Sequence, residues 1–163
     1  VLFRSLERST DKLMEDSHEY LDTKTGQIYD AAANFGDALR YTIQFKTGDF
    51  ADSVKKAVDD FAHEGFDPVK IKNFFNNDPK NSYRGINCQF RDSTTNQLFE
   101  VQFHTPESIA AQEVIHPIYE QNRKIEDKTS PEYSAGQQQM KDLWQAVPLP
   151  PGADVIGQRS VKG

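Results

Sequence analysis

Residues 83–105 read YRGINCQFRDSTTNQLFEVQFHT, two alternating runs on either side of a polar break. Within each run an apolar side chain stands at every second position, which is the pattern of a half-buried β-strand. The apolar members are Ile86, Cys88, Phe90, Phe99, Val101 and Phe103. The break at residues 92–97 is rich in Ser, Thr, Asn and Asp and suits a hairpin loop. The stretch therefore predicts a β-hairpin.

The polar positions of this hairpin form the first candidate site. If the two strands pair in antiparallel fashion, their polar side chains share one face. These side chains are Tyr83, Asn87, Gln89, Glu100, Gln102 and His104. Solvent alone does not require so specific a set, so we expect this face to bind a ligand.

Composition indicates one globular domain. The chain has 163 residues, with 27% charged and 36% hydrophobic, and no apolar run long enough to span a bilayer. Its net charge of −6 argues against charge-driven nucleic-acid binding and favours a small-molecule or protein partner. Cys88 is the only cysteine and is interpreted as a small core residue.

Periodicity elsewhere predicts an α+β fold: a mixed, largely antiparallel sheet of four or five strands, with flanking helices chiefly on one face. Further strands are expected at residues 37–45 and 69–75. Helices are expected at residues 1–22, at 50 or 51 to 64, at 105–126 with a kink or break at Pro117, and at 131–146. Residues 1–147 form the predicted domain, and the Pro/Gly-rich residues 148–163 form a predicted tail extended along the surface.

Three cations, Arg4, Arg8 and Lys12, recur at helical spacing in the first predicted helix. They suit either a solvated face or a clamp for a polyphosphate, in which several cations must converge.

Motifs for zinc, P-loop or serine-nucleophile chemistry are absent from the sequence. What remains is a pair of carboxylates, Asp37 and Glu100, an aromatic ring at Tyr83 and scattered cations. The cations are Arg4, Arg8, Lys12, Arg40, Lys72, Lys80 and Arg84. Acids for a divalent metal, cations for phosphates and a ring for a base are the parts that phosphoryl-type transfer needs.

Several segments in order resemble the synthetase domain of RelA/SpoT homologues. They are DALRYT at residues 37–42, KNFF at 72–75, PKNSYRGIN at 79–87 and FEVQFHT at 99–105. The resemblance covers residues 1–126 and is best from 79 to 105. It implies a RelA/SpoT synthetase-like (nucleotidyltransferase-like) fold. It also implies transfer of the β,γ-pyrophosphate of ATP to the 3′-hydroxyl of a purine nucleotide, with Mg²⁺ as cofactor.

The resemblance also implies roles for individual residues. Glu100 matches the catalytic, Mg²⁺-associated glutamate, Gln102 its partner on the strand, and Asp37 the Mg²⁺-binding aspartate. ATP phosphates would be bound by Arg4, Arg8, Lys12 and Arg40. The acceptor would be bound by Tyr83, Lys72, Lys80, Asn87, His104 and His116, with Tyr83 stacking on the base. His104 and His116 could also form a general-base or phosphate-contact pair, although structural histidines are commoner.

Four positions depart from the family pattern. Asp37 stands three residues before Arg40 instead of five, Gly85 replaces a serine, Asn87 a histidine, and His104 an arginine. Because these last three positions orient the acceptor in the family, the acceptor stays open.

The small size and the tail are similar to C-terminal toxin domains of bacterial effectors. This likeness implies a protein that acts in the bacterial cytoplasm, either on purine nucleotides to give (p)ppApp or (p)ppGpp, or on the 3′ end of tRNA. A cognate immunity protein is the expected partner, and the acidic charge weighs against tRNA. The alternatives are a non-catalytic nucleotide-binding module and an ADP-ribosyltransferase toxin.

Overall fold

The structure is a computed structural model that describes residues 39–76, 78, 82–157, 159 and 160. Its strands are β1 (Arg40–Gln44), β2 (Phe66–Asn73), β3 (Ile86–Asp92), β4 (Leu98–His104) and β5 (Arg159–Ser160). Its helices are the 3-10 turn η1 (Thr47–Asp49), α3 (Phe50–His63), α4 (Pro106–Asn122) and α5 (Pro131–Gln145). The predicted helix at residues 1–22 lies outside the described residues.

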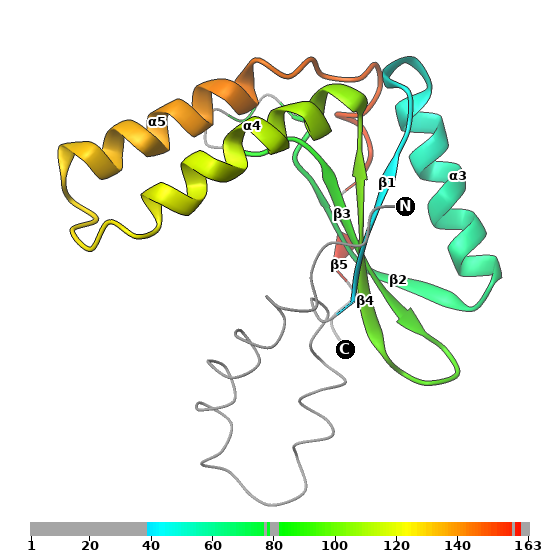
Figure 1. The fold of residues 1–163 in the computed structure, drawn as a ribbon. Helices are drawn as coiled ribbons and strands as arrows, with labels where there is room; N and C mark the ends of the chain where they lie inside the picture. Colours follow the sequence, from blue (N-terminus) through cyan, green and yellow to red (C-terminus); the bar gives the residue numbers. More distant parts are fainter. Residues whose placement is uncertain (1–38, 77, 79–81, 158, 161–163) are drawn as a thin grey trace, which may run out of the picture.

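The five strands form one twisted sheet in the order β1-β4-β3-β2-β5 (Figure 1). Strand β1 pairs with β4 in parallel, and the other neighbours pair in antiparallel fashion. This confirms the predicted α+β fold with a mixed, largely antiparallel sheet.

The β3–β4 pair is the predicted hairpin. Cys88 faces Val101 and Gln89 faces Glu100 across it, so apolar and polar side chains separate onto opposite faces. In the loop, Asp92 Oδ1 accepts hydrogen bonds from the backbone N–H groups of Thr94 and Thr95, at 2.7 and 3.2 Å. An Asp side chain that accepts a hydrogen bond from the backbone N–H two residues later is typical of a tight turn, which is what the polar break predicts.

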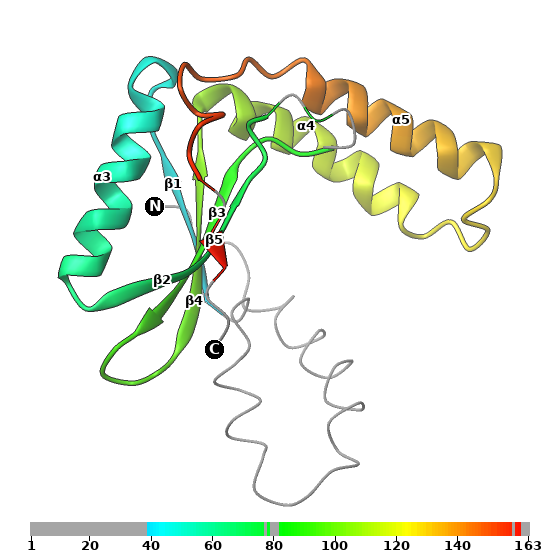
Figure 2. The ribbon, with the colours of Figure 1, turned by 180° about the vertical axis from the view of Figure 1, so that it is seen from behind.

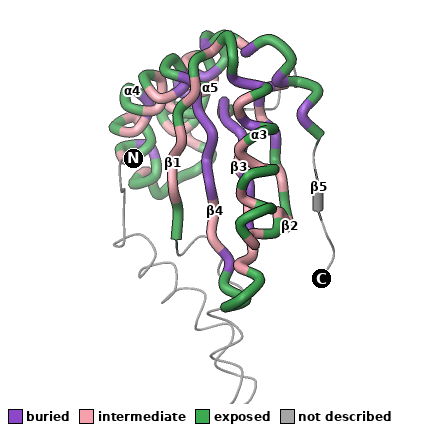
Figure 3. The backbone as a smooth tube through the Cα atoms, turned by 90° about the vertical axis from the view of Figure 1, so that its right-hand side faces the viewer, coloured by how far each residue is buried: buried purple, intermediate pink, exposed green. Residues whose placement is uncertain are grey.

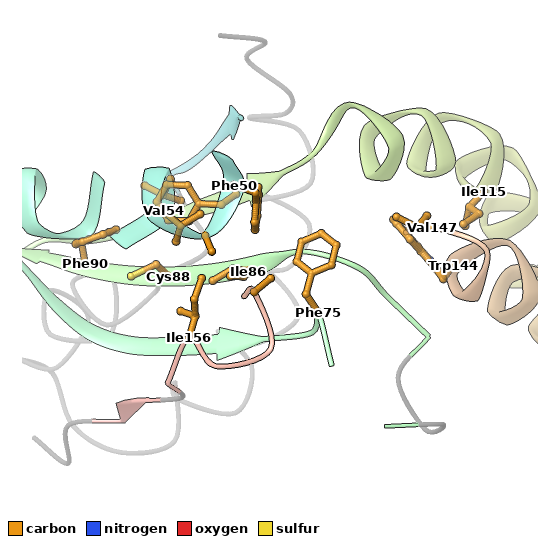
Figure 4. Close-up of a cluster of buried hydrophobic side chains, with 14 of the residues drawn as sticks. Phe50, Val54, Phe75, Ile86, Cys88, Phe90, Ile115, Trp144, Val147 and Ile156 are labelled. Carbon is orange, nitrogen blue, oxygen red and sulfur yellow. The ribbon is translucent and has the colours of Figure 1, made fainter. Parts of the chain in front are cut away.

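Helix α3 covers the apolar face of the sheet (Figure 2). Phe50 and Val54 of this helix pack with the buried side chains of Cys88 and Phe90 (Figure 4). Strand β4 lies between β1 and β3 and is buried over most of its length, as Figure 3 shows. The core therefore lies between α3 and the middle strands.

Helices α4 and α5 form an antiparallel pair that extends away from the end of β4 (Figures 1 and 2). This refines the prediction that the helices lie chiefly on one face of the sheet. The predicted kink or break at Pro117 does not end the helix, since α4 continues through it to Asn122. Strand β2 begins at Phe66 and ends at Asn73, earlier than predicted, because residues 66–68 pair with β3.

The prediction of a surface tail is wrong for its first part. Ala153 and Ile156 are buried in the core, 0% and 8% exposed. The Asn73 side chain donates hydrogen bonds to their carbonyl oxygens, at 2.6 and 3.0 Å. Burial of apolar side chains and of two satisfied carbonyls holds this Pro/Gly-rich segment against the sheet.

Among the described residues, none of the helices is long and apolar enough to cross a membrane.

Candidate functional site

The strand register gathers the predicted polar residues on the face opposite α3. Glu100 on β4 lies between Arg40 on β1 and Gln89 on β3. One level further along the sheet, Gln102 on β4 has Asn87 on β3 as its neighbour. Residues far apart in the chain thus form one polar surface, because directly opposed side chains point to the same side.

The Glu100 carboxylate is the centre of one cluster on this face. Arg40 Nε lies 2.7 Å from Glu100 Oε1, and Gln102 Nε2 donates to the same oxygen at 2.9 Å. The Glu100 side chain is 13% exposed. Among the described residues no donor reaches Oε2. The carboxylate is therefore oriented through one oxygen and available through the other, as a metal ligand or a base requires.

Tyr83 is the centre of a second cluster. Its Oη lies 2.9 Å from Nε2 of His104 and 3.2 Å from Oδ1 of Asn87. Its ring packs edge-on against Phe74 and Trp144, with centroids 5.2 and 5.1 Å away. Burial raises the pKa of Tyr83, and the nearby Glu100 carboxylate adds to the effect, so the phenol is protonated at neutral pH.

His104 is fully buried between Tyr83 and the start of α4. Its Nδ1 lies 2.9 Å from Oγ of Ser108, and its Nε2 faces Tyr83. Burial lowers the pKa of His104 to about 4, so the ring is neutral at neutral pH. The predicted direct contact of His104 with an acceptor is corrected, because both ring nitrogens already have protein partners.

Lys72 and His116 are the remaining described residues of the predicted acceptor site. Lys72 is exposed on β2 beside Asn87. His116 lies on α4, where its Nε2 is 3.8 Å from a carboxylate oxygen of Glu120. It lies eight positions after Ser108 in the helix, about 12 Å along the axis. The structure therefore does not form the pair of His104 with His116 considered above.

Arg84, one of the cations in the sequence, faces the backbone and not the polar face. It is 6% exposed and donates through Nη1 to the carbonyl oxygens of Phe74 and Asn76, at 3.1 and 3.2 Å. It thereby fastens the chain that follows β2.

Five predicted site residues lie outside the described part of the chain: Arg4, Arg8, Lys12, Asp37 and Lys80. Within the described part, no group of three or more His, Cys, Asp or Glu residues could hold a metal ion.

Ser108 and Trp144, which the sequence did not single out, belong to the Tyr83 cluster together with Gly85. Ser108 follows the predicted helix start at Thr105 and forms a capping box with it, so its hydroxyl position was readable from the sequence. A Cβ on Gly85 would lie 2.7 Å from Tyr83 Oη and 3.0 Å from Cε1 of His104, so only glycine fits there. Trp144 reaches Tyr83 from α5, for which no local sequence signal exists.

The fold is thus a mixed sheet with a helix on one face. The other face carries carboxylate, amide and aromatic side chains. No protein-family model and no curated protein sequence matches the chain. Several solved structures share its fold.

The chain is similar to the small alarmone synthetase 1 from Bacillus subtilis, with a TM-score of 0.53 at 14% identity over 88% of this chain and 72% of that one. It is similar to the small alarmone synthetase 2 from the same organism, with a TM-score of 0.52 at 19% identity over 87% of this chain and 69% of that one. It also resembles a GTP pyrophosphokinase family protein from Streptococcus pneumoniae, with a TM-score of 0.52 at 14% identity over 87% and 68% of the two chains. The chain has the RelA/SpoT synthetase-like fold that the sequence resemblance predicted.

Proposed function

We propose that this chain is an ATP-dependent pyrophosphokinase that modifies the 3′-hydroxyl of a purine nucleotide. The observation that carries the proposal is the Glu100 carboxylate, held through one oxygen by Arg40 and Gln102 on the polar face. It lies in the fold of the small alarmone synthetases, one of which was solved bound to its product pppGpp.

In the proposed reaction the acceptor 3′-oxygen attacks the β-phosphorus of ATP. A new O–P bond forms, the bond between the β-phosphorus and the oxygen that bridges to the α-phosphorus breaks, and AMP leaves. Glu100, directly or through a water that it orients, accepts the hydroxyl proton. Arg40 offsets the negative charge of Glu100 and of the phosphates, since a guanidinium suits phosphate oxygens.

The free Oε2 of Glu100 fits Mg²⁺, a hard cation that takes one or two carboxylates together with substrate phosphates. Asp37 is the second proposed ligand and lies outside the described residues. When bound, the metal would neutralise phosphate charge.

The acceptor is proposed to lie toward Tyr83, Asn87 and Lys72, with the exposed Lys72 ammonium near its phosphates. The remaining proposed acceptor residues are His116 and, outside the described chain, Lys80. The product is then of the (p)ppApp or (p)ppGpp type. The toxin role, the immunity partner and action in the bacterial cytoplasm stay predictions.

The test is transfer of label from γ-labelled ATP to ADP, ATP, GDP, GTP or tRNA. We expect labelled purine nucleotide with the wild type and a loss of at least about 100-fold with Glu100→Gln, which keeps shape and removes the base and the metal ligand. Glu113→Gln makes the same chemical change at an exposed position of α4 and should leave the rate unchanged. If no acceptor is labelled, or if Glu100→Gln is as active as the wild type, the proposal fails.

One observation favours a second candidate, a nucleotide-binding module without turnover. His104 is neutral and buried where the family pattern has an arginine, so that position supplies no cation to a phosphate. Calorimetry that shows nucleotide binding, together with no labelled product, would select this candidate. Labelled tRNA alone would select the tRNA alternative, and consumption of NAD without ATP would select an ADP-ribosyltransferase.

A further inference from the structure

Four hydrogen-bond contacts run in a chain from Asn87 to the first turn of α4. Asn87 Oδ1 lies 3.2 Å from Tyr83 Oη, and Oη lies 2.9 Å from His104 Nε2. His104 Nδ1 lies 2.9 Å from Ser108 Oγ, and Oγ lies 3.1 Å from the carbonyl oxygen of Thr105. The chain thus joins the polar face of the sheet to a buried helix cap.

The hydrogens along this chain can be counted. The Tyr83 hydroxyl, the neutral His104 ring and the Ser108 hydroxyl carry one each, which makes three hydrogens for four contacts. The Thr105 N–H supplies no hydrogen to these four contacts, because it donates to Ser108 Oγ, at 2.9 Å. With Asn87 Oδ1 facing Tyr83, one of the four contacts therefore lacks a hydrogen.

A protonated His104 would supply the fourth hydrogen. Its ring is fully buried, however, and among the described residues no carboxylate pairs with it. An unpaired buried charge is costly, and burial lowers the pKa of this histidine to about 4.

The Asn87 amide can supply the hydrogen instead. A half-turn about its last bond exchanges Oδ1 with Nδ2, two groups of nearly equal size. The Asn87 side chain makes no other hydrogen bond among the described residues, so the half-turn breaks no other side-chain bond. All four contacts then become hydrogen bonds in one direction, from Asn87 through Tyr83, His104 and Ser108 to Thr105.

We propose that Tyr83 and His104 hold the Asn87 amide with its carbonyl oxygen toward the acceptor site, so that Asn87 accepts a hydrogen bond from the acceptor nucleotide. The group that Asn87 binds is then a ribose hydroxyl or a base N–H, and not a phosphate oxygen, which has no hydrogen to donate. His104 is a positioning residue in this chain, since it touches Tyr83 and not the ligand. This inference rests on the proposed function.

Tight packing around Tyr83 restricts which groups its hydroxyl can reach. Gly85 lies against both Tyr83 and His104, where even one added carbon would be too close. Phe74 and Trp144 pack against the phenol ring. Packing therefore leaves Asn87 and His104 as the partners of the Tyr83 hydroxyl, and in the proposed chain this hydroxyl donates to His104.

The tautomer of His104 tests the proposal without any turnover. Long-range ¹H–¹⁵N NMR of the full-length protein at pH 7 distinguishes the two neutral tautomers and the imidazolium, and His104→Gln assigns the signal among the four histidines. We expect the neutral ring with its proton on Nδ1. A proton on Nε2, or on both nitrogens, would overturn the proposal.

Kinetics test the consequence for the acceptor. Tyr83→Phe removes the group that orients Asn87 and should raise KM for the acceptor about tenfold with KM for ATP unchanged, the effect of one lost hydrogen bond. Tyr119→Phe, an exposed tyrosine on α4, is the matched control and should change neither value. Equal changes in both KM values, or none, would contradict the proposal.

Acceptor analogues identify the donor. GDP is compared with 2′-deoxy-GDP and inosine diphosphate, and ADP with 2′-deoxy-ADP, since each analogue lacks one donor. At least one analogue should lose about tenfold in kcat/KM, and Asn87→Ala should abolish that difference. If every analogue equals its parent and Asn87→Ala leaves kcat/KM for GDP and ADP unchanged, Asn87 does not read a donor. Absence of any transfer refutes the proposed function instead, while the NMR result still decides the orientation of Asn87.

Discussion

At the scale of single residues, the buried His104 side chain connects two parts of the fold through its two ring nitrogens. Its Nδ1 contacts Ser108 of the capping box at the start of α4, and its Nε2 contacts Tyr83, which precedes β3. This arrangement requires a neutral imidazole, because a second proton would bury a positive charge with no carboxylate beside it among the described residues. The stability of the fold is therefore linked to pH through this residue.

We predict that acid destabilises the wild type more than His104→Gln. The native pKa of His104 is about 4, below the ordinary value near 6.5 of an unfolded histidine, so between these values the unfolded state binds more protons. The contribution of the neutral His104 to the free energy of unfolding is complete above pH 6.5 and is lost as pH falls toward 4. Between pH 7.5 and pH 5, urea unfolding should show about 1–2 kcal/mol more loss in the wild type than in the variant.

His63→Gln, at an exposed position near the end of α3, is the control and should follow the wild type. If His104→Gln also follows the wild type over this range, then His104 does not have a lowered pKa.

At the scale of elements, α4 and α5 are joined at a close approach. Asn122, at the end of α4, is 4% exposed and points at Gly136 of α5. A Cβ on Gly136 would clash with Oδ1 of Asn122, so this glycine allows the two helices to pack. Helix α5 also places Trp144 against the ring of Tyr83. The packing of the α4–α5 pair is therefore linked to the candidate site.

We predict that Gly136→Ala destabilises the protein by about 1–3 kcal/mol, because the added methyl group overpacks the contact with Asn122. The sign is informative, since the same change in a free helix stabilises it by about 1 kcal/mol. In an Asn122→Ala background the two nearest atoms are removed and only the Cβ of residue 122 remains, 3.3 Å from the added methyl group, so Gly136→Ala should become stabilising. Urea unfolding of the four proteins of this cycle measures the difference. A stabilising effect in both backgrounds would contradict the contact.

At the scale of the whole molecule, the C-terminal segment completes the core. It returns from α5 past Asn73, buries Ala153 and Ile156 and adds β5 beside β2. The predicted boundary between domain and tail after residue 147 therefore does not separate packed chain from unpacked chain.

The neighbours Val155 and Ile156 test this arrangement, because Val155 is 70% exposed and Ile156 is 8% exposed. Ile156→Ala should lower the free energy of unfolding by about 2–4 kcal/mol, through lost burial and the cavity that remains. Val155→Ala should change it by less than about 0.5 kcal/mol, as surface substitutions do. Similar small effects at both positions in urea unfolding would show that the segment lies on the surface.

Sequence reasoning predicted the elements well where one local period decides them. The alternation in β3 and β4 predicts both faces of the hairpin, and the apolar spacing of α3 predicts its buried side. The surface tail was wrong because Pro and Gly indicate irregular backbone, which does not by itself mean exposed side chains. The direct contact of His104 was wrong because burial depends on the packing of α4 and of Tyr83, which the hairpin alone does not encode.

The sequence by itself therefore determined which residues share the polar face, since Asn87, Gln89, Glu100 and Gln102 follow from the two-residue period of a strand. Only the tertiary structure decided how they meet their partners. The parallel pairing of β1 with β4 brings Arg40 to Glu100 across sixty residues of chain, and α4 brings Ser108 to His104 and so orients Tyr83. These contacts depend on long-range strand order and helix packing, for which local periodicity carries no information.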